Sequence, residues 1–137
     1  MRHERKAQAF CVGYGNSLRG DDAVGPYVAA RLGGMVIQQL VPELAERLAG
    51  QRLVVFIDAR RDLEPGAVEI LPIDTASVMT HSCSPGYLMR LVREVYGRAP
   101  QAFMVGIGGK AFEWGAPLSV AARMGGRQAI ARIRGLG

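Results

Sequence analysis

The sequence predicts an α/β fold, a three-layer α/β/α sandwich around a twisted, mostly parallel sheet with one antiparallel strand. Strand-like apolar runs alternate along the chain with helix-like stretches, and in this order the crossover connections place helices on both faces of a sheet. The run from Leu53 to Ile57 is apolar at every position, which is typical of a strand buried on both faces. With 137 residues the chain has the length of one domain, and we expect a single domain over 1–137.

Apolar periodicity and the placing of Gly and Pro give the expected elements in order. Strands are expected at 7–14, 35–39, 52–58, 67–73 and 101–107, and helices at 21–32, 42–49, 84–96 and 118–133. The helix at 84–96 has Ser84 as N-cap, Pro85 in its first turn and Gly97 as its stop. The strand at 67–73 follows a Glu-Pro-Gly turn and is expected to run antiparallel beside strand 52–58. In the last helix, the glycine pair at 125–126 weakens the middle.

Composition and charge exclude several classes of protein. The net charge is +5, and the basic excess lies at the two ends of the chain, with four Arg and no acid in 123–137. Because no basic stripe with interleaved aromatic residues is present, we expect no nucleic-acid partner, although the basic ends could dock an acidic one. The longest apolar run is too short to cross a membrane, and the N-terminal residues lack the apolar stretch of a signal peptide. We therefore expect a cytoplasmic protein with no membrane span.

The two cysteines of the chain have different settings. Cys11 lies within an apolar run and is expected in the core. Cys83 lies two residues from His81, so a thiolate nucleophile paired with that imidazole stays open as an interpretation. In a reduced cytoplasmic setting we expect no disulfide between the two.

Acidic and imidazole side chains follow several of the expected strands, at the edge where parallel sheets bind their ligands. Asp21 and Asp22 end the Gly-rich loop after the first strand, Asp58 ends the buried strand, and His81 lies in the loop before helix 84–96. One acid of the first pair, together with Asp58 and His81, would form a three-ligand metal site with open positions.

Asp58 is the acid whose position is hardest to explain by structure alone. It ends a run of apolar residues, where a carboxylate is costly unless it is paired, hydrogen-bonded or bound to a metal. Arg60, Arg61 or a loop amide could supply a structural partner. We favour a functional role, because perturbed carboxylates gather at binding and catalytic sites.

The loop after the first strand has a superficial likeness to a dinucleotide-binding fingerprint. Gly13 and Gly15 fit that pattern, but Leu18 stands where its third glycine belongs, and two carboxylates at the start of the helix would repel a phosphate. We therefore assign Gly13, Gly15, Asn16 and Asp21 to the support of the loop. Asn16 would brace it through its side-chain amide, and one of the two acids would stabilise the positive end of the helix.

Several segments, taken in order, resemble the hydrogenase maturation endopeptidases, which trim the C-terminal tail of the large subunit of nickel-iron hydrogenases. They are 13–25 (GYGNSLRGDDAVG), 54–59 (VVFIDA), the turn 64–66 (EPG), Thr80-His81 and 112–119 (FEWGAPLS). The resemblance implies an α/β/α fold and a cut made only after nickel has been installed in the precursor. It also implies that Asp22, Asp58 and His81 converge on that nickel as the catalytic and metal-contacting residues. Such a protease needs no cofactor of its own, because the substrate carries the nickel.

The chain departs from the family pattern at two places. Ala23 replaces a glycine that many members carry after the acidic pair, and 38–43 (QQLVPE) stands where many members show an Asp-Gly-Gly-Thr-like stretch. Other branches of the family have similar Gln-Leu-x-Pro-Glu segments. We therefore assign the chain to a subgroup with a different hydrogenase partner.

The first functional hypothesis is an aspartic-type, nickel-dependent endopeptidase that acts as a monomer on a nickel-loaded hydrogenase large-subunit precursor. The nickel would serve as recognition element and position the scissile bond. Either the metal or a carboxylate acting as general base would then activate the attacking group. The alternatives are a non-catalytic checkpoint module that binds a metal-loaded partner and, less favoured, a small nucleotide-binding domain.

Overall fold

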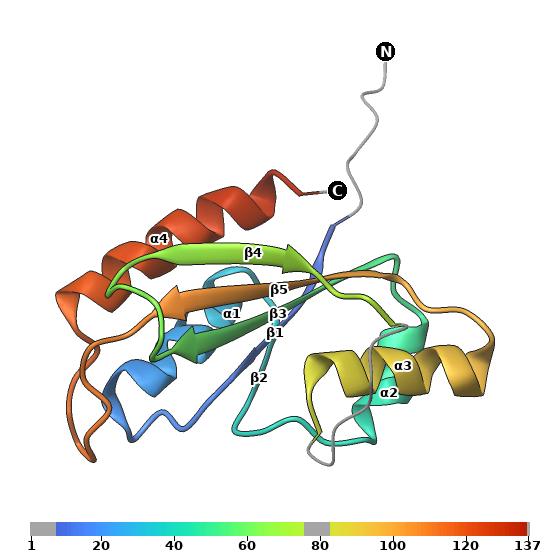
Figure 1. Cartoon of the computed structure of the whole chain (residues 1–137), viewed down its shortest axis with the longest axis horizontal. Coiled ribbons are helices and arrows are strands. Elements are labelled where there is room, and N and C mark those ends of the chain that lie inside the picture. The colour runs from blue at the N-terminus through green and yellow to red at the C-terminus, as the bar shows by residue number, and fades with distance from the viewer. Residues whose placement is uncertain (1–7, 76–82, 137) are drawn as a thin grey trace.

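The computed structural model describes residues 8–75 and 83–136, and these form a five-stranded sheet flanked by helices (Figure 1). The strands are β1 (Phe10–Tyr14), β2 (Met35–Ile37), β3 (Leu53–Arg60), β4 (Val68–Pro72) and β5 (Gln101–Gly108). The helices are α1 (Val24–Arg31), α2 (Leu44–Ala49), α3 (Pro85–Tyr96) and α4 (Val120–Arg134), with a short 3-10 helix η1 (Gly20–Ala23) before α1. The predicted α/β/α sandwich is confirmed. No helix within the described ranges is both long enough and apolar enough to cross a lipid bilayer.

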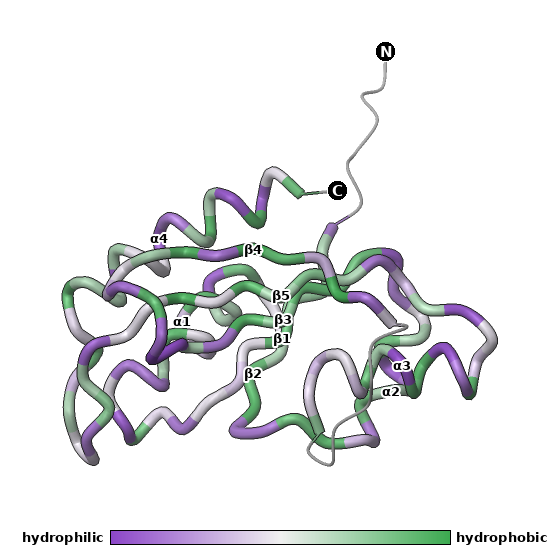
Figure 2. The backbone as a smooth tube through the Cα atoms, in the orientation of Figure 1, coloured by the Kyte–Doolittle hydropathy of each residue, from purple (hydrophilic) through white to green (hydrophobic). Residues whose placement is uncertain are grey.

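Two apolar cores hold the helices to opposite faces of the sheet. On one face α1 and α4 pack against Val55 and Ile57, and on the other α2 and α3 pack against Val54 and Phe56. Because alternate side chains of β3 enter both cores, this strand is apolar from Leu53 to Ile57, as its sequence indicates. Figure 2 shows the hydrophobic residues concentrated on the central strands, whereas α3 and α4 alternate between hydrophobic and hydrophilic residues.

The strand order is β2-β1-β3-β5-β4, with β4 antiparallel and the other pairings parallel. The prediction that β4 runs antiparallel is right, but the predicted neighbour is wrong. β4 pairs with β5, through Val68 opposite Ile107 and Glu69 opposite Gly106, and not with β3. The buried, apolar part of β3 suits a central place with a strand on each side, and β1 and β5 take those places. The half-exposed β4, which ends at Pro72, suits an edge because Pro donates no hydrogen bond.

The helix ends differ from the expected ones in places where local geometry decides. Ser84 caps α3 by accepting a hydrogen bond from the Tyr87 amide at 3.1 Å, and Gly97 ends the helix with a φ of 82°, both as the sequence indicates. Asp21 and Asp22, by contrast, lie in η1, so the α-helix starts only at Val24.

The glycine pair does not interrupt α4, because each glycine lies against another element. A Cβ added at Gly125 would come within 2.8 Å of the Gly66 carbonyl oxygen in the turn before β4. A Cβ at Gly126 would lie 3.2 Å from the Tyr27 ring of α1. The low helix propensity of the pair is therefore offset by close packing, which only a residue without a side chain permits.

Gly25 lets the first turn of α1 lie directly on β3. A Cβ at this position would overlap the carbonyl oxygen of Ile57 and lie 2.9 Å from that of Tyr14. We expect Gly25→Ala to lower the free energy of unfolding by about 1–3 kcal/mol, because backbone atoms on both sides must shift. Chemical denaturation monitored by circular dichroism measures this loss.

Gly50→Ala is the matched control for this substitution. Gly50 follows α2 with a φ of −84° and has no atom within 4 Å of an added Cβ. Its replacement is expected to be neutral or to stabilise by about 0.4–1 kcal/mol, because alanine restricts the unfolded chain. Equal stabilities of the two variants would contradict the close packing of α1 on β3.

Candidate functional site

A cleft of about 440 Å³ opens at the carboxyl edge of the sheet. Its lining comes from the ends of β1 and β3, from η1, and from the segments after β2 and before α3: Tyr14, Gly15, Asp22, Gln38, Gln39, Leu40, Asp58 and Cys83. The structure thus brings together Asp22 and Asp58, two acids that are 36 positions apart in the chain. His81, the third predicted site residue, lies outside the described residues.

Asp22 is held in the cleft by the loop that precedes it. Its Oδ2 atom accepts a hydrogen bond from the backbone amide of Asn16 at 2.6 Å. Gly15 makes this turn possible, because its φ is 149° and an added Cβ would overlap the Asp22 carbonyl oxygen. The Asn16 side chain braces the same loop by accepting from the Leu18 amide at 2.9 Å. The carboxylate of Asp22 therefore has a fixed orientation.

Asp58 lies near the carboxyl end of β3, two residues before the last one, in a setting that disfavours its charge. Burial, and to a smaller extent the negative charge of Asp22, raise the pKa of its carboxyl to about 6. Hydrogen bonds from the Ala59 amide and the Tyr14 hydroxyl, and the positive charge of Arg60, only partly oppose this rise. Two acids of the same cleft thus repel each other, and a bound cation would relieve that repulsion.

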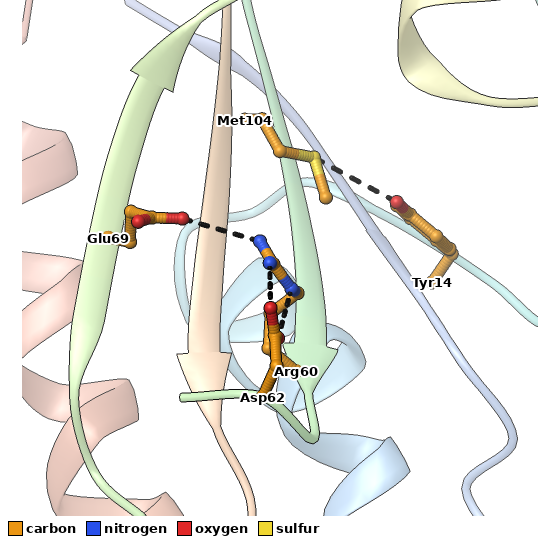
Figure 3. Close-up of polar contacts among 5 residues, drawn as sticks. All are labelled: Tyr14, Arg60, Asp62, Glu69 and Met104. Atoms are coloured by element: carbon orange, nitrogen blue, oxygen red, sulfur yellow. Dashed lines mark hydrogen bonds and ion pairs between the residues drawn. The ribbon is translucent and has the colours of Figure 1, made fainter. Parts of the chain in front are cut away.

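The two arginines that could neutralise Asp58 are engaged elsewhere. Arg60 forms ion pairs with Asp62 at 2.6 Å and Glu69 at 3.3 Å, and Figure 3 shows its guanidinium between these two acids. Gly106 on β5 leaves room for the Arg60 side chain to reach β4, since an added Cβ would lie 2.8 Å from the Arg60 Cγ. The guanidinium of Arg61 lies over the Phe112 ring at 3.9 Å. Neither side chain forms an ion pair with Asp58 among the described contacts.

Tyr14 is a site residue that the sequence analysis missed. Its hydroxyl hydrogen-bonds to Asp58 and also lies 3.9 Å from the sulfur of Met104, the contact drawn in Figure 3. Burial first, and then the charge of Asp58, raise the pKa of Tyr14 far above its usual value, so the hydroxyl stays protonated and can donate. The available signal was its place at the carboxyl end of β1, one residue after the Gly13–Ile57 pairing.

Cys83 lines the cleft but is not set up as a thiolate. Burial and the negative charge of Glu43 raise the pKa of its thiol, which disfavours the form that attacks as a nucleophile. His81, with which the sequence analysis pairs Cys83, lies outside the described residues. Cys11 is buried in the core, as predicted, and both cysteines are free thiols.

Asp21, next to Asp22 in the chain, points into the protein and does not line the cleft. It is fully buried and joins η1 to the loop that follows β5. Its carboxylate accepts from the amides of Lys110 (2.7 Å), Ala111 (3.0 Å) and Ser119 (2.7 Å) and from the Ser119 hydroxyl (2.7 Å). Burial alone would raise the pKa of Asp21, but these hydrogen bonds outweigh it and the pKa is lowered. Asp21 thus supports two loops at once.

The glycines of the first loop are explained by the packing of the chain on itself. A Cβ at Gly13 would overlap the Gly25 carbonyl oxygen, and Gly15 is tight against Asp22. The Asn16 amide, a donor that a phosphate would use, is bonded to the Asp22 carboxylate. These contacts disfavour the nucleotide-binding alternative.

Asp22 and Asp58 are the acids that this cleft offers to a metal ion. In residues 8–75 and 83–136, no three His, Cys, Asp or Glu side chains gather closely enough to hold an ion. The described part of the cleft therefore provides two carboxylate ligands, and further ligands must come from elsewhere.

Comparison with known proteins identifies the fold. No family model matches the chain, and no curated protein sequence matches it. Among solved structures, the hydrogenase maturation protease HycI of Thermococcus kodakarensis KOD1 superposes with a TM-score of 0.73 at 22% identity, over 94% of this chain and 91% of that chain. The hydrogenase maturating endopeptidase HybD of E. coli gives 0.73 at 20% identity, over 92% and 89%. HybD of T. kodakarensis gives 0.70 at 22% identity, over 91% and 95%.

The chain has the fold of the hydrogenase maturation proteases. The agreement extends over nearly all of the chain, so it includes the elements that carry the cleft. In this maturation-protease fold, the ends of β1 and β3 supply Tyr14 and Asp58, while η1 supplies Asp22. The fold class expected from the resemblance is confirmed.

Asp21→Asn tests the role of the buried carboxylate. An amide can keep one acceptor oxygen, but its NH₂ group then faces an N–H donor, so we expect a loss of about 2–4 kcal/mol at pH 7. Because the folded pKa is lowered, the contribution of Asp21 is present above pH 4 and is lost as the pH falls through the folded pKa. Urea denaturation at pH 7 and at lower pH measures both effects. A stability equal to wild type at pH 7 would contradict the anchoring role.

Asp58→Asn is expected to change stability in the opposite direction. Its folded pKa of about 6 exceeds the unfolded value of 3.8, so the folded state loses stability as the pH rises from 4 through 6. The amide removes this cost, and we expect a gain of about 1–2 kcal/mol at pH 7.5 and none at pH 4. Melting temperatures between pH 4 and 8 measure the difference, with the exposed Glu46→Gln as control. A variant less stable than wild type at pH 7.5 would show that Asp58 is a satisfied structural acid.

Proposed function

We propose that the chain belongs to the hydrogenase maturation endopeptidases and removes the C-terminal tail of a nickel-loaded hydrogenase large-subunit precursor. The observation that carries this proposal is the pair of acids, Asp22 and Asp58, in one cleft where the positive charge of Arg60 only partly offsets the cost of ionising Asp58. The maturation-protease fold and the ordered motifs of the sequence support the same conclusion. The proposed partner is the precursor itself, met in the cytoplasm by a monomeric protease.

The chemistry of the cleft fits a cation that arrives with the substrate. Carboxylates and neutral imidazole are suitable ligands for nickel, so Asp22, Asp58 and, from the sequence, His81 would complete the coordination of a nickel already held by the precursor. The protease needs no metal of its own in this scheme. Because its ligands fix the metal, the nickel holds the nearby scissile bond in place and makes cleavage depend on nickel loading.

Asp58 also has the properties of a proton acceptor. With a pKa of about 6, it is ionised at neutral pH and still basic enough to take a proton from an attacking water. The Tyr14 hydroxyl, which donates to Asp58, orients the carboxylate for either role. Both roles require ionised Asp58, and this is the sense in which we propose an aspartic-type, nickel-dependent endopeptidase.

The test is an intact-mass assay on nickel-loaded precursor incubated with wild type, Asp22→Asn, Asp58→Asn and His81→Ala. We expect wild type to shorten the precursor, and each variant to do so at a rate reduced by about a hundredfold or more, because each change removes a charge or ligand at the reacting centre. The control is Glu46→Gln, an exposed acid on α2 away from the cleft, which should process at the wild-type rate.

Two results would contradict the proposal. Full processing by Asp22→Asn and Asp58→Asn would overturn the assignment of these acids. A precursor that binds wild type but keeps its full mass would favour the non-catalytic checkpoint module. Circular dichroism spectra and melting curves of each variant show that a loss of processing is not a loss of folding.

A further inference from the structure

Two loops at the carboxyl edge of the sheet present large side chains to solvent. Leu18 lies in the loop after β1 and is 63% exposed, and Trp114 lies in the loop after β5 and is also 63% exposed. Arg19 lies beside them, and we name these three residues the Leu18–Trp114 platform. Exposed apolar side chains of this size that occur together mark interaction surfaces more often than scattered single ones do.

The platform is held together by contacts between its two loops. The Arg19 guanidinium lies over the Trp114 ring, 5.3 Å from its centroid, and the Gly115 amide donates to the Leu18 carbonyl at 2.8 Å. The Arg19 Nε donates to the Phe112 carbonyl at 3.4 Å. Figure 1 shows the two loops running side by side at this end of the molecule.

Buried hydrogen bonds hold the same two loops together beneath the exposed side chains. Asp21, two residues after Arg19, binds Lys110, Ala111 and Ser119 on the second loop. The exposed side chains therefore project from a braced surface. A braced aromatic side chain loses little conformational entropy on binding, which favours affinity.

The platform and the cleft share one segment of chain. Leu18 and Arg19 are four and three positions before Asp22, whose carboxylate lines the cleft. A folded protein that inserts a chain end or a metal centre between Asp22 and Asp58 would therefore lie next to the loop that carries Leu18 and Arg19. A small-molecule substrate would not need to cover it.

The charge of the platform narrows the chemistry of its partner. Arg19 forms no ion pair with an acid in the described part of the chain, where the ion pairs involve Arg60 and Arg90. A second copy of the chain docked by a two-fold axis would place one Arg19 near the other, which is unfavourable. An acidic protein surface is favoured instead.

We propose that the Leu18–Trp114 platform docks the folded body of the protein whose metal centre enters the cleft. This inference rests on the proposed function and names the surface by which the substrate is held. The partner surface has an apolar depression that receives Trp114 and a carboxylate at its rim that meets Arg19. Trp and Arg are, together with Tyr, the residue types enriched at the energetic centre of protein interfaces.

The experiment measures binding and cleavage separately on the full chain, with nickel-loaded hydrogenase large-subunit precursor as probe. We expect Trp114→Ala and Arg19→Glu each to weaken precursor binding, measured by biolayer interferometry, by about tenfold or more. We expect KM for tail removal to rise in proportion and kcat to stay within about twofold, because the platform does not touch the reacting atoms.

Tyr96→Ala is the matched control. Tyr96 is an exposed aromatic residue at the end of α3, just before the start of β5 and therefore at the opposite edge of the sheet, and its replacement should leave binding unchanged. Melting temperatures of all variants should lie within about 4 °C of wild type. A large drop for Trp114→Ala, with unchanged binding, would show a merely structural role.

The outcomes separate the inference from the proposed function. If Trp114→Ala and Arg19→Glu bind the precursor as tightly as wild type does, the platform is overturned. Tail removal by these variants would still support the endopeptidase. Binding that depends on the platform, with the tail retained, supports the docking surface and overturns the endopeptidase. If the precursor does not bind wild type, the platform is overturned. It is also overturned if wild type forms a concentration-dependent dimer that Trp114→Ala abolishes.

Discussion

The carboxylate of Asp21 is the interaction on which this end of the molecule depends. It is fully buried and accepts hydrogen bonds from three backbone amides and one hydroxyl of the loop between β5 and α4. That loop would otherwise leave its amides without partners at the carboxyl edge of the sheet, where buried donors are costly. By binding them, Asp21 fixes η1, and η1 in turn fixes the direction in which Asp22 points.

Two acids at this end of the molecule thus have opposite settings. The charge of Asp21 is stabilised by hydrogen bonds that outweigh the cost of its burial, whereas the charge of Asp58 is destabilised by burial and by Asp22. The first arrangement adds to folding stability and the second subtracts from it. A chain selected for stability alone would place an amide or an apolar residue at the end of β3. The proposed function accounts for the acid there by a partner that binds it.

Much of the fold was predictable from the sequence, because its signals are local. The apolar run of β3 indicates a strand buried on both faces, and Ser84, Pro85 and Gly97 mark the ends of α3 through the backbone geometry that each favours. The neighbour of β4 was not predictable in this way. Alternation of side chains identifies β4 as a strand, but its neighbour depends on the pairing of β5 with β3, which leaves the other side of β5 for β4.

The residues of the candidate site also fall into two groups, those that a local sequence signal indicates and those whose role appears only in the folded structure. Asp58 and the Asp21–Asp22 pair were found from the sequence because polar residues that follow strands meet at one edge of a parallel sheet, and the family resemblance then selected Asp22 from the pair. Tyr14 was missed, because its role comes from the register that places it beside Asp58. The partners of Asp21 are 89 to 98 positions away, and a helix-cap interpretation uses only near neighbours. A pattern within a short stretch of sequence cannot predict contacts between residues that lie so far apart in the chain.

The raised pKa of Asp58 and the rigidity of the surrounding loops have a joint consequence for binding. A flexible site could relax its repulsion by letting Asp22 and Asp58 separate, but Asp22 is tied to Asn16 and its helix is anchored through Asp21. The repulsion therefore persists in the free protein and is relieved only by a proton or a cation. Because a ligand that binds the ionised form must displace the proton, its binding strengthens as the pH rises through about 6. A cation that reaches the cleft at neutral pH meets an ionised Asp58 and an Asp22 carboxylate already held in place, so little reorganisation opposes its binding.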